Sequence, residues 1–119
     1  MTSNEKIKIV VIEDDQIIRE SYTYIINNHP DFEIVGSFSS AEAAMNQLKQ
    51  LDPHVIFLDI ELPGANGIEA IPLIKKQVND AYVIMLTVYD TAKTVFDALS
   101  NGASGYLTKD VTPDKIMDA

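Results

Sequence analysis

Short apolar runs alternate along this chain with longer segments in which apolar residues recur every three or four positions. The runs cover Ile7–Ile12, Phe32–Phe38, His54–Asp59, Tyr82–Thr87 and Ser104–Lys109, and they are rich in β-branched and aromatic residues, as strands are. The third and fourth runs are apolar at nearly every position, which is typical of parallel strands covered by helices on both faces. The sequence therefore predicts an α/β domain in which a strand followed by a helix is repeated five times.

The first two predicted helices carry recognisable signals. The first places Ile18, Tyr22 and Ile25 on one face, at the spacing of an amphipathic helix. The second begins with a capping box made by Ser39 and, three residues later, Glu42. Its predicted apolar face consists of small or aliphatic residues, namely Ala41, Ala44 and Leu48.

The third predicted helix contains a proline. Its apolar pattern is Ile68, Ile71, Ile74 and Val78, and Pro72 lies within that pattern. A proline inside a helix removes one backbone hydrogen bond. We therefore expect this helix to begin late or to be kinked.

The last two helices have signals at their ends. The fourth helix is expected to stop at Asn101–Gly102, a pair suited to a left-handed C-cap. The fifth is expected to begin with Thr112 as N-cap and Pro113 at its first position. Only seven residues follow Thr112, so we expect residues 1–119 to be one domain of a longer protein.

Composition narrows the class of protein. A chain of 119 residues with 46% hydrophobic and 23% charged residues is typical of one soluble globular domain. It has no cysteine and no long apolar stretch, which excludes thiolate chemistry and predicts neither secretion nor a membrane span. We expect a cytoplasmic protein. A net charge of −9 disfavours direct contact with nucleic acid, so protein partners and metal ions are expected instead.

Candidate functional residues stand at the ends of the predicted strands. Glu13–Asp15 follow the first strand, while Asp59, Thr87 and Lys109 end the third, fourth and fifth. In an open parallel sheet, ligands bind outside the carboxyl ends of the strands. We therefore expect these side chains to lie at one edge of the sheet.

Each of these residues also has an ordinary structural interpretation. An acidic triplet after a strand is favourable at a helix N-terminus, a threonine packs well in a strand, and a lysine can extend along a surface. Asp59 is harder to explain in this way, because a carboxylate that follows the apolar Val55–Leu58 lies at the edge of a dry core. The four positions taken together favour a functional site.

The grouped carboxylates predict a metal ion. Neighbouring carboxylates repel one another unless a cation neutralises them, and an all-oxygen site suits a hard ion such as Mg²⁺. Beside such an ion, Asp59 could act as a nucleophile toward a phosphoryl group. Lys109 would supply positive charge and the Thr87 hydroxyl a hydrogen-bond donor to the phosphoryl oxygens.

The segments IKIVVIEDDQIIRE, HVIFLDIELPGANGIEA, VIMLT and GASGYLTKD together resemble the CheY-like receiver domain of bacterial response regulators, and the resemblance extends over the whole chain. It implies a flavodoxin-like, doubly wound sheet with strand order 2-1-3-4-5. It also implies that Asp59 is the phosphoacceptor. The spacing to Arg19 assigns the two Mg²⁺-binding acids of the family to Glu13 and Asp14.

The same resemblance implies roles for further residues. The backbone carbonyl of Glu61 would complete the protein's share of the metal shell. Thr87 and Tyr106 look like the family's switch pair, and Lys109 like the lysine that contacts the phosphoryl group. Glu61 and Tyr89, two residues beyond Asp59 and Thr87 respectively, flank the expected path of attacking water and are expected to tune the lifetime of the phosphorylated form.

The resemblance also implies partners. A sensor histidine kinase would supply the phosphoryl group, and the domain would catalyse its own modification as a signalling switch rather than act as a metabolic enzyme. Lys109 is followed by Asp110 where many members have proline; "YLTKD" is similar to regulators with a helix-turn-helix output domain. Nucleic acid would be reached only through that domain. Homodimers could form through the face built by the helix before Asn101, the strand Ser104–Lys109 and the helix after Thr112.

Three other classes share parts of the pattern. A Toprim-like nuclease or topoisomerase fragment would also use a strand-end glutamate with an acidic pair, here Asp59 and Glu61, but it predicts nucleic-acid affinity and leaves Thr87 and Lys109 unexplained. A haloacid-dehalogenase-like phosphatase would be expected to carry its aspartate after the first strand. A flavodoxin-like flavin protein would need a phosphate loop rich in hydroxyl groups and glycine, which the sequence lacks.

Overall fold

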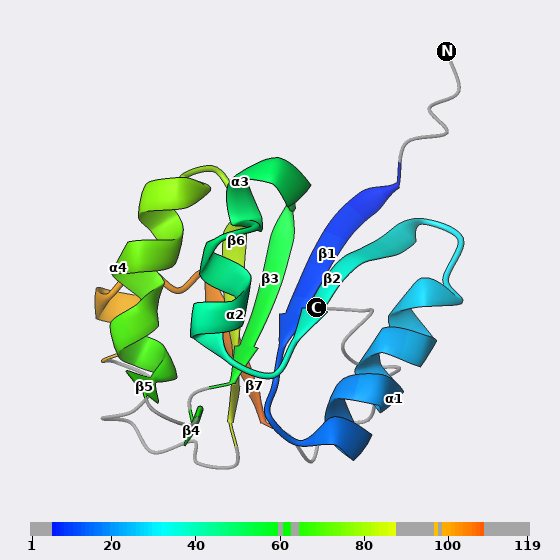
Figure 1. Ribbon diagram of the computed structural model, residues 1–119, viewed down its shortest axis with the longest axis horizontal. Helices are drawn as coiled ribbons and strands as arrows, with labels where there is room; N and C mark the ends of the chain where they lie inside the picture. Colours follow the sequence, from blue (N-terminus) through cyan, green and yellow to red (C-terminus); the bar gives the residue numbers. More distant parts are fainter. Residues whose placement is uncertain (1–5, 60, 63–64, 88–96, 98, 109–119) are drawn as a thin grey trace.

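Five parallel strands form one sheet at the centre of the molecule (Figure 1). The computed structural model describes residues 6–59, 61–62, 65–87, 97 and 99–108. The strands lie in the order β2-β1-β3-β6-β7, which is the predicted order 2-1-3-4-5 when these five are numbered along the chain. Their bounds are β1 (Ile7–Ile12), β2 (Phe32–Phe38), β3 (Val55–Asp59), β6 (Tyr82–Thr87) and β7 (Gly105–Thr108).

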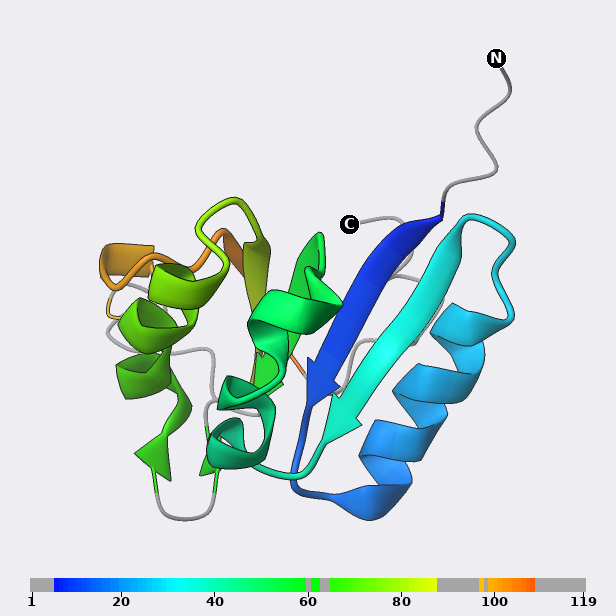
Figure 2. The ribbon, with the colours of Figure 1, turned by 45° about the horizontal axis from the view of Figure 1, so that its top comes forward.

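Helices cover both faces of the sheet, as predicted (Figures 1 and 2). Helix α1 (Gln16–Asn27) packs on one face, and α2 (Ala41–Met45), α3 (Leu48–Leu51) and α4 (Gly67–Gln77) pack on the other. A short antiparallel pair, β4 (Glu61–Leu62) and β5 (Ala65–Asn66), stands between β3 and α4. Within the described ranges, none of the helices has the length and apolar character needed to cross a membrane.

The alternation of side chains along each strand divides the core into two clusters. On β1, Val10 and Ile12 belong to the cluster beneath α2, α3 and α4, while Ile9 and Val11 belong to the cluster beneath α1. Among the described residues, the first cluster is the larger. Its completely buried aliphatic members include Leu48, Ile56, Leu58, Ile71, Ile74 and Val83.

Strand β2 contains one extra residue relative to β1. Ile9 is opposite Ile34, but Val10 is opposite Gly36, so that Val35 has no counterpart on β1. Ile34 packs with the cluster beneath α1, whereas Val35 and Phe38 pack with the cluster on the other face. The extra residue thus changes which face the second half of β2 presents to the core.

The first helix follows its predicted pattern with one difference. Tyr22 and Ile26 are buried in α1, whereas Ile18 and Ile25 are only partly buried. At the carboxyl end of α1, the buried side chain is therefore Ile26 and not the predicted Ile25. Asp15 caps the helix, because its side chain accepts a hydrogen bond from the amide of Ile18.

The second predicted helix differs in its cap and in its continuity. Ser40, not Ser39, is the N-cap, and its Oγ accepts a hydrogen bond of 3.2 Å from the amide of Ala43. The expected helix is also divided into α2 and α3, because the amide of Gln47 bonds to Ala44, three residues back, and tightens the turn. The predicted apolar residues are nevertheless buried, namely Ala41, Ala44 and Leu48.

The proline in α4 does not delay the helix. The helix begins at Gly67, before Ile68, and continues through Pro72, so the expected late start is wrong. Pro72 is on the exposed side, while Ile71 and Ile74 are completely buried. Gly102 follows the helical residues 97 and 99–100 and has a φ of 112°, which fits the predicted left-handed C-cap. The predicted N-cap Thr112 and Pro113 lie outside the described residues.

Candidate functional site

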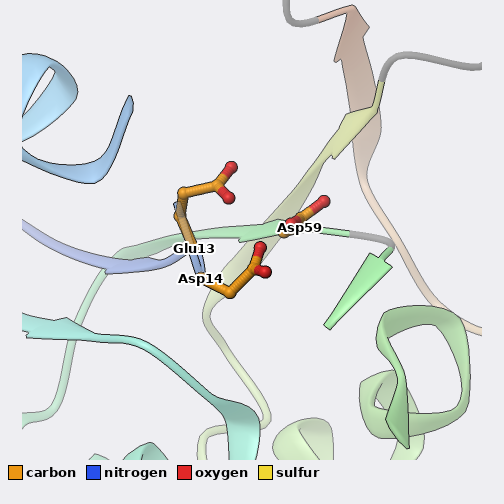
Figure 3. A group of neighbouring side chains, drawn as sticks. All are labelled: Glu13, Asp14 and Asp59. Carbon is orange, nitrogen blue, oxygen red and sulfur yellow. The ribbon is translucent and has the colours of Figure 1, made fainter. Parts of the chain in front are cut away.

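Strand pairing brings two acidic residues together at one edge of the sheet. β1 and β3 are neighbours, and Ile12 is opposite Leu58 in their parallel pairing. Glu13 directly follows Ile12, and Asp59 directly follows Leu58, so the two lie side by side where the strands end (Figure 3).

A third carboxylate completes the group. Oxygen atoms of Glu13, Asp14 and Asp59 all lie within 4.8 Å of one another. Glu13 and Asp59 are completely buried, with 0% of each residue exposed, whereas Asp14 is exposed. The group therefore has two acids at its base and one at its opening to solvent, and Figure 3 shows all three at this edge.

The main chain holds Glu13 at both ends of the residue. Its amide donates a 3.0 Å hydrogen bond to the carbonyl of Phe38 on β2. Its carbonyl accepts one of 2.7 Å from Nη1 of Arg19, and its carboxylate Oε2 accepts one of 3.0 Å from the amide of Asp15. Glu13 is thus fixed to β2 on one side and to α1 on the other.

The three acids after β1 have different roles in the structure. Asp15 caps α1 through the 3.0 Å bond from the amide of Ile18, while Glu13 and Asp14 join Asp59. The cap was missed by the sequence reasoning, although an aspartate three residues before the apolar position Ile18 is an N-cap signal. The structural contact of Arg19 was also missed, and no local sequence pattern points to it.

The structure describes only some of the remaining predicted site residues. Asp59 is opposite Leu86 in the pairing of β3 with β6, so Thr87 is the next residue along the neighbouring strand. Tyr106 lies in β7 with 41% of its surface exposed. Glu61 lies in β4. The side chains of Glu61 and Thr87, and the whole of Tyr89 and Lys109, fall outside what the structure describes.

The donor set fits a hard divalent cation. Three carboxylates with oxygen atoms within 4.8 Å of one another repel strongly, most of all where two of them are removed from water. Oxygen donors select ions such as Mg²⁺ or Ca²⁺ rather than metals that prefer sulfur or nitrogen. These three side chains could therefore hold a small hard cation.

Comparison with known proteins gives a consistent picture. A family model described as the response regulator receiver domain matches residues 9–119. The transcriptional regulatory protein DegU of Brevibacillus brevis is 35% identical over 117 residues, which are 98% of this chain and 50% of that protein. The nitrate/nitrite response regulator NarL of Escherichia coli K12 is 31% identical over 119 residues, covering 100% of this chain and 55% of NarL.

A solved structure agrees with these sequence matches. The crystal structure of a two-component response regulator of the LuxR family from Aurantimonas sp. SI85-9A1 superimposes with a TM-score of 0.89 and 29% identity, covering 97% of this chain and 82% of that one. The chain spans about half the length of the curated relatives it matches.

Proposed function

Because the chain belongs to the family of response regulator receiver domains, we propose that it is the phosphoryl-accepting switch of a two-component system and that Asp59 is the acceptor. The observation that carries this proposal is the buried carboxylate of Asp59 within 4.8 Å of those of Glu13 and Asp14. Membership of this family also removes the nuclease, phosphatase and flavin-binding alternatives.

Glu13, Asp14 and Asp59 would hold the metal, together with the backbone carbonyl of Glu61. When bound, Mg²⁺ would neutralise the carboxylates and the negative charge of an incoming phosphoryl group. The base of this site is preorganised, since Glu13 is buried and hydrogen-bonded at its amide, its carbonyl and its carboxylate. The exposed Asp14 would meet the hydrated ion first.

The transfer itself needs one nucleophile and fixed charge. A carboxylate oxygen of Asp59 attacks the phosphorus of a phosphohistidine on the kinase, and the bond between phosphorus and the imidazole nitrogen breaks. The electron pair stays on that nitrogen, which leaves a neutral histidine after proton exchange with solvent. Lys109 and the Thr87 hydroxyl would donate to the phosphoryl oxygens. The support for Thr87 is its position, because it follows Leu86, which is opposite Asp59 in the pairing of β3 with β6.

The new charge would change a surface some distance away. Phosphorylation adds nearly two negative charges and three acceptor oxygens. Thr87 would move toward these oxygens, and Tyr106, which is 41% exposed on β7, would turn its ring inward into the space that Thr87 leaves. The face that includes β7 would then be recognised by a partner.

The relatives support a proposal about the signalling context. DegU and NarL are regulators about twice the length of this chain, so residues 1–119 would be the receiver domain of a longer transcriptional regulator that acts in the cytoplasm. A sensor histidine kinase would be its donor. Contact with nucleic acid would be made by the output domain, and phosphorylation would favour a homodimer through the face that contains β7.

Intact mass spectrometry tests the proposal directly. The chain is incubated with Mg²⁺ and acetyl phosphate, and one phosphoryl adduct is expected on the wild type and none on Asp59→Asn. Asp52→Asn is a matched control, because Asp52 precedes β3 at the opposite end of the same strand and has a φ of 48° that asparagine tolerates. An adduct that persists in Asp59→Asn, or its absence from the wild type, would contradict the proposal.

A further inference from the structure

The side chain of Arg19 connects helix α1 to the acidic group. Its Nη1 donates a 2.7 Å hydrogen bond to the backbone carbonyl of Glu13, six residues earlier, and the contact is partly buried. The backbone amide of Arg19 also bonds to the carbonyl of Asp15 at 2.9 Å, in the first turn of α1. One residue thus fastens the segment between β1 and α1 from both its main chain and its side chain.

The bonded carbonyl belongs to the peptide unit that joins Glu13 to Asp14. Because a peptide unit is planar, fixing its oxygen restrains the Cα atoms of both residues, from which the two carboxylates project. Residues 13–15 belong to neither β1 nor α1. Backbone hydrogen bonds restrain the two ends of this segment, at the amide of Glu13 and the carbonyl of Asp15, whereas the carbonyl of Glu13 accepts its bond from the Arg19 side chain. The side chain of Arg19 supplies a restraint that secondary structure does not provide.

We propose that Arg19 is a positioning residue for the metal site, which sets the placement of Glu13 and Asp14 through the peptide unit between them. The inference rests on the proposed function, since it concerns the affinity of the same site for Mg²⁺. Arg19 touches neither the metal nor the phosphoryl group in this scheme. Outer residues that orient metal ligands are worth about 10- to 100-fold in metal affinity.

The charge of Arg19 would act in the opposite direction. A guanidinium is always protonated in proteins, so its positive charge near a cation site weakens cation binding. Removal of Arg19 therefore has two effects of opposite sign on the affinity for Mg²⁺. A loss of affinity identifies positioning as the dominant effect, and a gain identifies charge.

Three variants separate the two effects. Arg19→Met keeps the aliphatic stem and removes both charge and donors. Arg19→Lys keeps the charge and can still donate one bond, so it is expected to recover most of the lost affinity. Thr23→Ala is the matched control on α1, because the Thr23 hydroxyl donates a 2.7 Å bond to the carbonyl of Arg19 and does not involve the guanidinium.

Mg²⁺ affinity is measured by following backbone amide signals of residues 13–15 in NMR titrations, which suit a chain without tryptophan. We expect about 10-fold weaker binding or more in Arg19→Met, a smaller loss in Arg19→Lys and wild-type affinity in Thr23→Ala. Unchanged or tighter binding in Arg19→Met would overturn the inference. Failure of the wild type to bind Mg²⁺ would instead overturn the proposed function.

A kinetic measurement gives an independent readout. The rate of Asp59 phosphorylation by acetyl phosphate is measured against Mg²⁺ concentration. A positioning role predicts that Arg19→Met shifts the Mg²⁺ dependence to higher concentration and approaches the wild-type rate at saturation. A lowered rate at saturating Mg²⁺ with an unshifted midpoint would contradict it. If Arg19→Met does not fold, Arg19→Gln takes its place with the same expectations.

Discussion

Glu13 and Asp59 are two fully buried acidic residues at the carboxyl ends of neighbouring strands, with carboxylate oxygens within 4.8 Å of each other. Two carboxylates this close to each other and away from water repel strongly. A divalent cation bound between them would offset that repulsion. Stability in the presence and absence of metal is therefore a sensitive measure of this site.

We predict that Mg²⁺ stabilises the folded wild-type chain. A ligand that binds only the folded state at 100 times its Kd contributes about 2.7 kcal/mol to the free energy of unfolding. The expected rise in melting temperature is seen by calorimetry with Mg²⁺ against excess EDTA. Most of it is lost in Asp59→Asn and kept in Asp52→Asn. An equal rise in wild type and Asp59→Asn would place the ion elsewhere.

Thr87→Ala should separate phosphorylation from the change in surface. The proposed acceptor Asp59 is intact in this variant, so an adduct is still expected, although one proposed donor to the phosphoryl oxygens is gone. The ring signals of Tyr106 are then expected to stay as in the unphosphorylated domain. NMR spectra with Mg²⁺ and acetyl phosphate make the comparison, and a wild-type shift of Tyr106 in Thr87→Ala would refute the coupling.

Glu61 and Tyr89 are predicted to set the lifetime of the phosphorylated form. Each stands two residues beyond a member of the site, and both would flank the approach of water to the aspartyl phosphate. Replacing either with alanine is expected to change the rate of autodephosphorylation. Decay of the adduct after removal of acetyl phosphate measures that rate. Decay at the wild-type rate in both variants would remove them from the mechanism.

Asp15 is predicted to contribute to stability rather than to metal binding. Its Oδ1 caps α1 by accepting the 3.0 Å bond from Ile18, and loss of such a cap costs about 1 kcal/mol. We expect that loss in Asp15→Ala by urea denaturation, with near wild-type stability in Asp15→Ser, which keeps a capping oxygen. Equal loss in both variants would mean that the carboxylate has another stabilising role.

A fully buried residue and a highly exposed one, Leu58 and Ile17, give a further prediction. Leu58 is 0% exposed in β3, and Leu→Ala at such a site costs about 2 to 5 kcal/mol because a cavity remains. Ile17, 77% exposed at the start of α1, should tolerate alanine with little loss of stability. Chemical denaturation of both variants tests the packing. A small effect of Leu58→Ala would show that the core closes around the gap.

The sheet and the position of the site could be predicted because each depends on a periodic or positional rule. Runs of apolar residues specified the buried strands, and their last residues specified the edge where Glu13 and Asp59 meet. The burial of both faces of β3 follows from the same pattern, with Leu58 in one cluster and Phe57 in the other. Such a pattern extends over a whole strand or helix, so one wrongly assigned residue does not change the prediction.

The features that could not be predicted from the sequence, namely the cap of α2 and the contact of Arg19, depend on single contacts. Ser39 and Ser40 are adjacent, and Ser40 caps the helix whose Ala41 and Ala44 are buried in the core. The contact between Arg19 and the carbonyl of Glu13 spans the join between a strand and a helix. The pattern of apolar and polar residues does not predict such contacts, because they depend on how helices and strands pack against one another.

Pro72 shows the limit of a different rule. A proline breaks a helix when the lost hydrogen bond is not compensated, yet α4 continues through it. Ile71 and Ile74, on either side of the proline, are both completely buried. Tertiary packing of these side chains outweighs one missing bond, and the local sequence does not reveal that balance.

The pairing of β2 beyond the unmatched Val35 makes the length of its second half critical. Deleting Val35 would leave Phe38 opposite Ile12, whereas deleting Ser37 would move Phe38 opposite Val11 and turn it away from the layer that it now helps to fill. The carbonyl of Phe38 accepts a hydrogen bond from the amide of Glu13, so the deletion of Ser37 would also displace the first of the clustered acids. This half of β2 is therefore intolerant of changes in length, although it contributes no side chain to the clustered acids.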